Sequence, residues 1–255
     1  MGLLTISEKL QAPLINRMGL IKRRNWMNFL KNLPQGIPHK IKQQIFLHKS
    51  RKEQFEVVYK AGGFGSSPSL SGVGSNFENT ENIRVELPKL VNKYRITTIL
   101  DIPCGDLYWM RHVDLGSINY TGADIIEELV RINEQKYGSG TKSFQVLDIV
   151  EDKLPCVDLV ICRDCLIHLK LKDILSALAS IKKSGSKYLL VSTYPQSKAN
   201  SELGEQFWRP INLQIKPFAL GDPLEIIHDG PVERKEEEPY KCIALWKVND
   251  LPDVK

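Results

Sequence analysis

Residues 99–106 read ILDIPCGD, a short apolar run that reaches a carboxylate and then a turn. The β-branched residues of 97–102 predict a buried strand, and the proline and glycine after it predict a break in that strand. In open α/β sheets, ligands bind where such strands end at their carboxyl side. The stretch therefore predicts a strand, and it marks one edge of a sheet as the place for a site.

The same unit recurs along the chain. Further strands are predicted at 120–125, 143–148, 157–162 and 187–193, with helices at 127–137 and 171–183 between them. This alternation predicts a doubly wound, mostly parallel α/β sheet with right-handed crossovers. Two last strands, at 225–228 and 241–248, predict an antiparallel hairpin on its edge.

Another helix is expected before residue 97. Ser75 and Glu78 have the spacing of a capping box, which predicts a helix that starts there and carries an apolar stripe to Tyr94. Pro88 is expected to kink that helix or to end its regular part.

Composition limits the class of protein. The 255 residues are 42% hydrophobic and 25% charged, which is typical of a globular chain with one sizeable core and an appendage. We find no run near the roughly 18 apolar residues that a membrane span needs. An odd number of cysteines and no secretory signal favour reduced thiols and a cytoplasmic location. Cys162 and Cys165 form one Cys-x-x-Cys without a second pair, so no metal is expected.

The charge is uneven. Residues 1–60 hold 12 Lys and Arg against 3 Asp and Glu, whereas the remainder holds 23 against 27. A basic segment can contact nucleic acid, an anionic membrane surface or an acidic partner. The other interpretation is a helical extension that packs on the body, because Ile41, Ile45 and Phe46, and then Phe55 and Val58, recur at helical spacing. Residues 1–60 are accordingly predicted as a basic helical extension.

Residues 62–75 read GGFGSSPSLSGVGS. A nucleoside-triphosphate loop needs a lysine after its last glycine and a strand before it, and this run has neither. Two interpretations stay open, a flexible linker and part of a site. We divide the chain into the extension, a lid or linker at 61–75 and a main domain at 76–255.

Carboxylates follow three of the predicted strands: Asp101, Asp124 and Asp148. Asp124 stands 19 residues after Gly105, which suits a carboxylate that accepts hydrogen bonds from both hydroxyl groups of a ribose. A dinucleotide enzyme would pair such an acid with Gly-x-Gly-x-x-Gly, but this loop has one glycine. The pattern favours a nucleoside ligand without a pyrophosphate.

Four segments carry a resemblance. ILDIPCGD, YTGADI, FQVLDI and VDLVICRDCLIHL resemble, in order and spacing, the motifs of class I S-adenosylmethionine-dependent methyltransferases over residues 75–248. The resemblance implies a Rossmann-like seven-stranded sheet, S-adenosyl-L-methionine as cofactor and S-adenosyl-L-homocysteine as product. SGVGS, IPCGDLYWM, RDCLIHL and WRPINLQIKPF are similar to a branch often found among glycan-modifying proteins, which implies a sugar or glycan acceptor.

The resemblance also implies roles for single residues. Pro103 and Leu107 depart from the family pattern, which has glycines there, so the backbone geometry of the loop is open. The cofactor set expected is the methionine-side Asp101, Cys104, Gly105 and Asp106, the ribose-side Asp124 and Ile125, the adenine-side Asp148, Ile149 and Arg163, the lid residues Ser71, Gly72 and Ser75, and Arg84 for the methionyl carboxylate.

Methyl transfer to a hydroxyl needs an aligned acceptor and a base, and Asp164 and His168 follow the fourth strand in the right place. The residues expected to bind a sugar ring are Tyr108, Trp109, Trp208, Arg209 and Asn212. Cys165 lacks an adjacent proline, so methylation of a nucleobase carbon is disfavoured. Three functions remain: a sugar O-methyltransferase, a nucleic-acid methyltransferase that uses the basic segment, and a non-catalytic module.

Overall fold

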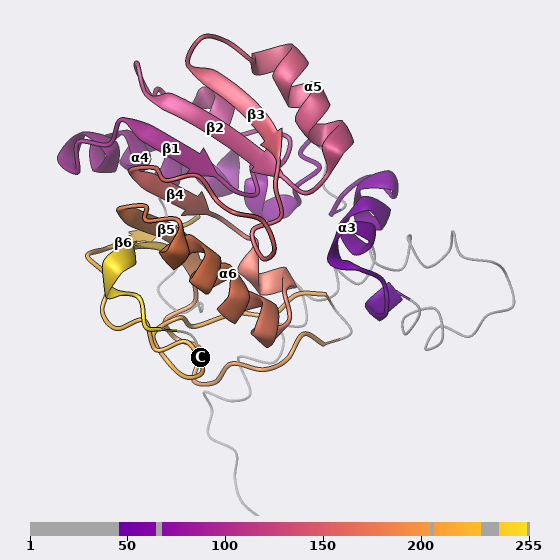
Figure 1. Ribbon diagram of the computed structural model, residues 1–255, viewed down its shortest axis with the longest axis vertical. Coiled ribbons are helices and arrows are strands. Elements are labelled where there is room, and N and C mark those ends of the chain that lie inside the picture. Colours follow the sequence, from indigo (N-terminus) through magenta and orange to yellow (C-terminus); the bar gives the residue numbers. More distant parts are fainter. Residues whose placement is uncertain (1–45, 65–67, 205–206, 231–239, 254–255) are drawn as a thin grey trace, which may run out of the picture.

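The computed structural model describes residues 46–64, 68–204, 207–230 and 240–253 (Figure 1). These residues form a seven-stranded sheet in the order β3-β2-β1-β4-β5-β7-β6. The strands are β1 (Thr98–Asp101), β2 (Asn119–Asp124), β3 (Lys142–Val146), β4 (Leu159–Cys162), β5 (Tyr188–Thr193), β6 (Glu225–His228) and β7 (Cys242–Lys247). The first five strands pair in parallel, and β7 enters antiparallel between β5 and β6. The predicted sheet and its C-terminal hairpin are confirmed.

Four α-helices accompany the strands in the described residues: α3 (Arg51–Lys60), α4 (Glu81–Lys93), α5 (Glu127–Tyr137) and α6 (Leu171–Lys183). Successive residues of a strand point to opposite faces, so the core divides into two clusters. Leu100 packs with α6 on one face, whereas Ile99 packs with α4 on the other. Both faces of the sheet are therefore covered, and its open edge is the carboxyl end of the parallel strands.

The predicted start of α4 is wrong, and of the two outcomes expected for Pro88 the structure contradicts one, the end of the helix. Ser75 ends a short 3-10 helix, η1 (Val73–Ser75), and α4 begins later, at Glu81, without a side-chain cap. The capping box of the structure starts α3 instead, where Ser50 and Glu53 exchange hydrogen bonds. Pro88 does not end α4, which runs on to Lys93 because its buried face continues through the proline in Leu87, Leu90 and Val91. Packing of that face outweighs the backbone hydrogen bond that proline cannot donate.

The basic N-terminal segment enters the described structure only at its end. Ile41 and Ile45 lie outside the described residues, whereas Phe46 and Val58 form a small cluster with Phe207. Figure 1 shows α3 beside the ends of α5 and α6. None of the described helices is both long and apolar enough to cross a membrane.

Candidate functional site

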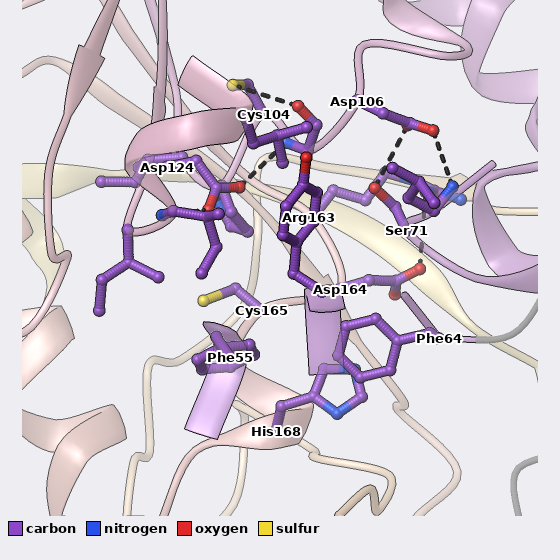
Figure 2. A pocket seen from close by; sticks show the side chains of 18 of the residues that line it. Phe55, Phe64, Ser71, Cys104, Asp106, Asp124, Arg163, Asp164, Cys165 and His168 are labelled. Carbon is purple, nitrogen blue, oxygen red and sulfur yellow. Dashed lines mark hydrogen bonds and ion pairs between the residues drawn. The ribbon is translucent and has the colours of Figure 1, made fainter. Parts of the chain in front are cut away.

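One cavity lies at the carboxyl ends of β1, β2 and β4, between the sheet, α3, residues 63–64 and residues 70–75 (Figure 2). Fourteen of the predicted site residues line it: Ser71, Ser75, Asp101, Cys104, Gly105, Asp106, Trp109, Asp124, Ile125, Asp148, Ile149, Arg163, Asp164 and His168. The strand-end carboxylates thus share one site, as the topology predicts.

We define the floor of the cavity as Asp101, Asp124 and the loop 103–106. Hydrogen bonds from neighbouring elements hold it in place. The Asp124 carboxylate accepts from the backbone nitrogens of Gly105, at 3.2 Å, and Ile126, at 3.0 Å. Asn133 donates to the Gly105 carbonyl at 2.7 Å. Gly105 has a φ of 56° and Leu107 one of 57°, so Leu107 keeps a left-handed turn, a conformation that favours glycine. The loop therefore has a defined shape despite its missing glycines.

Two floor carboxylates, Asp101 and Asp124, are buried, and both have pKa values above the ordinary value of an aspartate. Burial raises the pKa of Asp101 to about 7, against the hydrogen bond of 2.6 Å that Tyr120 donates to it. Burial likewise raises the pKa of Asp124 to about 6. A ligand that brings hydroxyl or ammonium donors to these groups would offset the cost of burying their charge.

The lid segment, residues 68–75, lies directly on this loop. Asp106 accepts from the Ser69 hydroxyl at 3.0 Å and from the Leu70 nitrogen at 2.8 Å. A Cβ at Gly105 would lie 2.2 Å from the Ser71 hydroxyl oxygen, so only glycine permits this approach. The carboxylate of Asp106 thus holds the lid segment in this structure.

A buried ion cluster ties the lid to the sheet. Arg163 is 2.9 Å from Asp229 and donates to the Gly74 carbonyl at 2.6 Å. Lys241 bridges Asp164, at 2.7 Å, and Asp229, at 2.9 Å. Burial lowers the pKa of Arg163, but the charges of Asp229 and Asp164 outweigh it and raise that pKa. Arg163 thus contacts Asp229, just after β6, rather than Asp148, just after β3, on the side where the adenine is expected.

At the other end of the cavity, α3 approaches Asp148. Arg51 donates to both Asp148 oxygens, from Nε at 3.0 Å and from Nη2 at 2.6 Å, and also reaches Glu151. Asp148 is separated from Arg51 by 97 residues in sequence. The arginine closes the cavity beside the carboxylate expected to flank adenine.

The two candidate bases have different surroundings. Asp164 adopts a left-handed φ of 55°, and Lys241 and Ser192 contact its carboxylate. The His168 Nδ1 lies 2.5 Å from the Phe207 carbonyl oxygen, and the ring stacks on Phe64 at 4.6 Å. A carbonyl only accepts, so Nδ1 carries the hydrogen, and Nε2 is the nitrogen that can take a proton.

Six predicted site residues do not line the cavity: Gly72, Arg84, Tyr108, Trp208, Arg209 and Asn212. Arg84 lies over the Phe77 ring, and Gly72, in the lid segment, lies against the Phe64 side chain. Arg209 is buried and donates to the carbonyls of Ser201 and Ile167.

The side chains of the other three also have contacts elsewhere. Asn212 donates to the Pro195 and Ser197 carbonyls, and Trp208 packs edge-on against Tyr194. Tyr108 lies under the Arg111 guanidinium. These six residues therefore lie outside the cavity in this structure.

Sequence reasoning missed several walls of the cavity. Arg51, Phe55, Val58 and Tyr59 reach it from α3, and Phe64 and Cys165 also line it. The helical spacing of the α3 residues was visible in the sequence, but nothing local showed what they face. Within the described ranges, no group of three or more His, Cys, Asp or Glu side chains is placed to hold a metal ion.

No family model and no curated protein matches the chain. Among solved structures, 1,6-didemethyltoxoflavin-N1-methyltransferase from Burkholderia thailandensis, with S-adenosylhomocysteine bound, is 16% identical, with a TM-score of 0.54 over 85% of this chain and 92% of that one. N-methyltransferase NodS from Bradyrhizobium japonicum, also with S-adenosylhomocysteine, is 12% identical, with a TM-score of 0.51 over 71% and 95%. The methyltransferase domain of bacterial CtHen1 is 12% identical, with a TM-score of 0.50 over 66% and 98%. The chain therefore has the fold of class I S-adenosylmethionine-dependent methyltransferases.

Proposed function

We propose that this protein is an S-adenosylmethionine-dependent methyltransferase that methylates a hydroxyl group, with a sugar or glycan as the acceptor. The observation that carries the proposal is the meeting of Asp101, Asp124 and Asp148 in one cavity beside the Gly105 loop. Each carboxylate comes from the end of a different strand of the sheet, and helix capping would not require them to meet.

The residues present fit this cofactor. Asp101 and Asp124 are buried carboxylates with raised pKa values, so each gains from a donor brought by a ligand. Asp124 would take the ribose hydroxyls, Asp101 the methionyl ammonium group, and Asp148 with Ile149 would border the adenine.

The cofactor supplies an electrophilic methyl group when bound, so the chain must orient the acceptor and remove its proton. His168 suits the base role, because donation from Nδ1 to Phe207 leaves Nε2 as the accepting nitrogen. Asp164 is held by Lys241 and Ser192, which favours a positioning role for it.

The acceptor is proposed from the walls around His168. Trp109, Phe55 and Phe64 line the cavity, and aromatic walls suit the apolar face of a sugar ring. One face of Phe64 is stacked on His168, and the Arg163 guanidinium lies over the Trp109 ring, so a sugar would use the remaining surfaces. Trp208, Arg209 and Asn212 lie elsewhere and give no support. The basic segment 1–60 keeps a nucleic-acid acceptor as the second candidate.

Calorimetric titration with S-adenosylmethionine and S-adenosylhomocysteine tests the cofactor step. Asp124→Ala should weaken binding by about 100-fold or more, since it removes two hydrogen bonds to a charged group. Asp114→Ala, at an exposed loop carboxylate, is the matched control. A folded wild type that binds neither compound would refute the proposal and favour a non-catalytic module.

Activity tests the base. With a panel of sugars, nucleotide sugars and oligonucleotides, His168→Ala should abolish transfer while it leaves cofactor affinity intact. Asp164→Asn should retain measurable transfer. The reverse result would assign the proton to Asp164.

A further inference from the structure

Cations and aromatic rings alternate on a surface beside the cavity. We define the arginine patch as Phe77, Arg84, Tyr108, Arg111 and His112. The Arg84 guanidinium carbon lies 3.4 Å from the Phe77 ring centroid, and the Phe77 ring meets His112 edge-on at 5.0 Å. The Arg111 guanidinium lies 5.0 Å over Tyr108, and its Nε donates to His112 at 3.1 Å. Both guanidinium groups therefore gather around one imidazole.

The positive charge of the patch is not neutralised by the described residues. Among them, neither Arg84 nor Arg111 forms an ion pair with a carboxylate. Their hydrogen bonds go to uncharged partners, from Arg84 to the Phe77 carbonyl and from Arg111 to the Tyr137 hydroxyl. Burial and then the charges of Arg111 and Arg84 lower the pKa of His112.

The patch adjoins the cavity along two chain segments. Ser75 lines the cavity two residues before Phe77, and Trp109 lines it two residues before Arg111. Phe77 is 44% exposed, and Arg111 and His112 are exposed as well. Two walls of the cavity are thus joined to the patch by chain segments only two residues long, which is the basis for placing parts of one ligand at both.

We infer that the arginine patch binds a phosphate group of the acceptor, so that the acceptor is a phosphorylated small molecule such as a sugar phosphate or a nucleotide-linked sugar. Guanidinium forks match phosphate oxygens in pairs. Stacking on Phe77 and Tyr108 holds the forks in place before a ligand arrives, which reduces the entropy lost on binding. The inference about the acceptor rests on the proposed function, whereas phosphate binding by the patch does not.

Titration of His112 by NMR tests the patch in the full-length protein, with inorganic phosphate as the probe. Bound phosphate should raise the pKa of His112, because a negative charge nearby stabilises the imidazolium. Arg84→Gln and Arg111→Gln should each weaken phosphate binding about tenfold, as expected for one charge-assisted hydrogen bond. Arg95→Gln, at an exposed arginine away from the patch, is the control. If inorganic phosphate does not change the pKa of His112 in the wild type, the inference is overturned, whatever result the variants give.

Competition identifies the source of the phosphate. Glucose 6-phosphate and UDP-glucose should displace inorganic phosphate from the patch, and glucose should not. A short single-stranded RNA that binds through Arg84 and Arg111 with steep salt dependence, while both sugar compounds fail, would overturn the assignment to a small molecule. S-adenosylhomocysteine affinity, measured in parallel, should not change in Arg84→Gln. If the wild type binds phosphate but no cofactor, the proposed function and the inference about its acceptor both fail, whereas phosphate binding by the patch stands.

Discussion

The floor and the cover of the cavity are held by different kinds of contact. The cover consists of α3 and the lid segment. Floor bonds join residues at most 28 apart in sequence, in neighbouring elements, such as Gly105 and Asp124, 19 residues apart. Cover bonds join Ser69 to Asp106 across 37 residues and Arg51 to Asp148 across 97, and Arg163, which holds the lid, is 66 residues from Asp229. The floor is thus part of the sheet, whereas the cover depends on charged groups brought from far along the chain.

It follows that the cover of the cavity can open while the floor stays folded. Floor residues sit on β1 and β2, whose pairing gives them the stability of the core. The cover is attached through ion pairs, the hydrogen bonds of Asp106 and the small cluster of Phe46, Val58 and Phe207, which is much smaller than the two clusters that pack on the sheet. Attachments of this size open at lower free energy than the core unfolds.

The largest loss of stability is expected from Asp229→Ala. If this variant were as stable as the wild type, the ion cluster would not hold the cover, and the contrast between cover and floor would fail. The Asp229 side chain is fully buried and faces Arg163 and Lys241. Its loss leaves buried cations without their partner, and the free energy of unfolding should fall by about 3–5 kcal/mol. Urea denaturation measures this. Asp253→Ala, which removes an exposed ion pair with Lys182, should leave the unfolding midpoint unchanged.

A smaller effect separates the lid from the floor. Gly105→Ala places a methyl group against the Ser71 hydroxyl and forces alanine into a φ of 56°. We expect a loss of about 1–3 kcal/mol in stability, together with weaker S-adenosylhomocysteine binding. Adding Ser71→Gly should restore the stability lost through the clash with the Ser71 hydroxyl, but not the stability lost through backbone strain at residue 105. Gly140→Ala, with open space around its Cα, is the control. A double variant no better than Gly105→Ala would show that the lid contact contributes nothing.

The remaining prediction is a pH dependence of the floor. The folded protein holds a proton on Asp101 up to about pH 7, whereas the ordinary value is 3.8. Because the unfolded chain binds fewer protons in that window, the free energy of unfolding should fall as the pH rises from about 4 to about 7. Cationic S-adenosylmethionine should bind more tightly over the upper part of the same rise. Asp101→Asn should remove the contribution of Asp101 to the pH dependence of the free energy of unfolding and of S-adenosylmethionine affinity. If both dependences were unchanged in this variant, Asp101 would not be their source.

The same contrast explains what the sequence could predict. The strands and the carboxylates at their ends follow from local apolar runs, and parallel strands bring those ends to one edge. Arg84 was expected in the site because of its position near the lid. Its guanidinium instead stacks on the ring of Phe77, seven residues earlier, and donates to the Phe77 carbonyl. Arg209 reads as an exposed donor, yet backbone carbonyls of the segment carrying His168 accept its hydrogen bonds. The contact of Arg84 with Phe77 is local, whereas the carbonyls that Arg209 contacts lie 42 and 43 residues away, and only the fold brings those partners together.

The pairing of Arg51 with Asp148 has a thermodynamic consequence. One carboxylate both anchors α3 and borders the proposed adenine site. Docking of the helix and binding of the cofactor are then linked equilibria, and each changes the other by the same factor. A partner that drew the basic N-terminal segment away, and α3 with it, would alter cofactor affinity without touching the sheet.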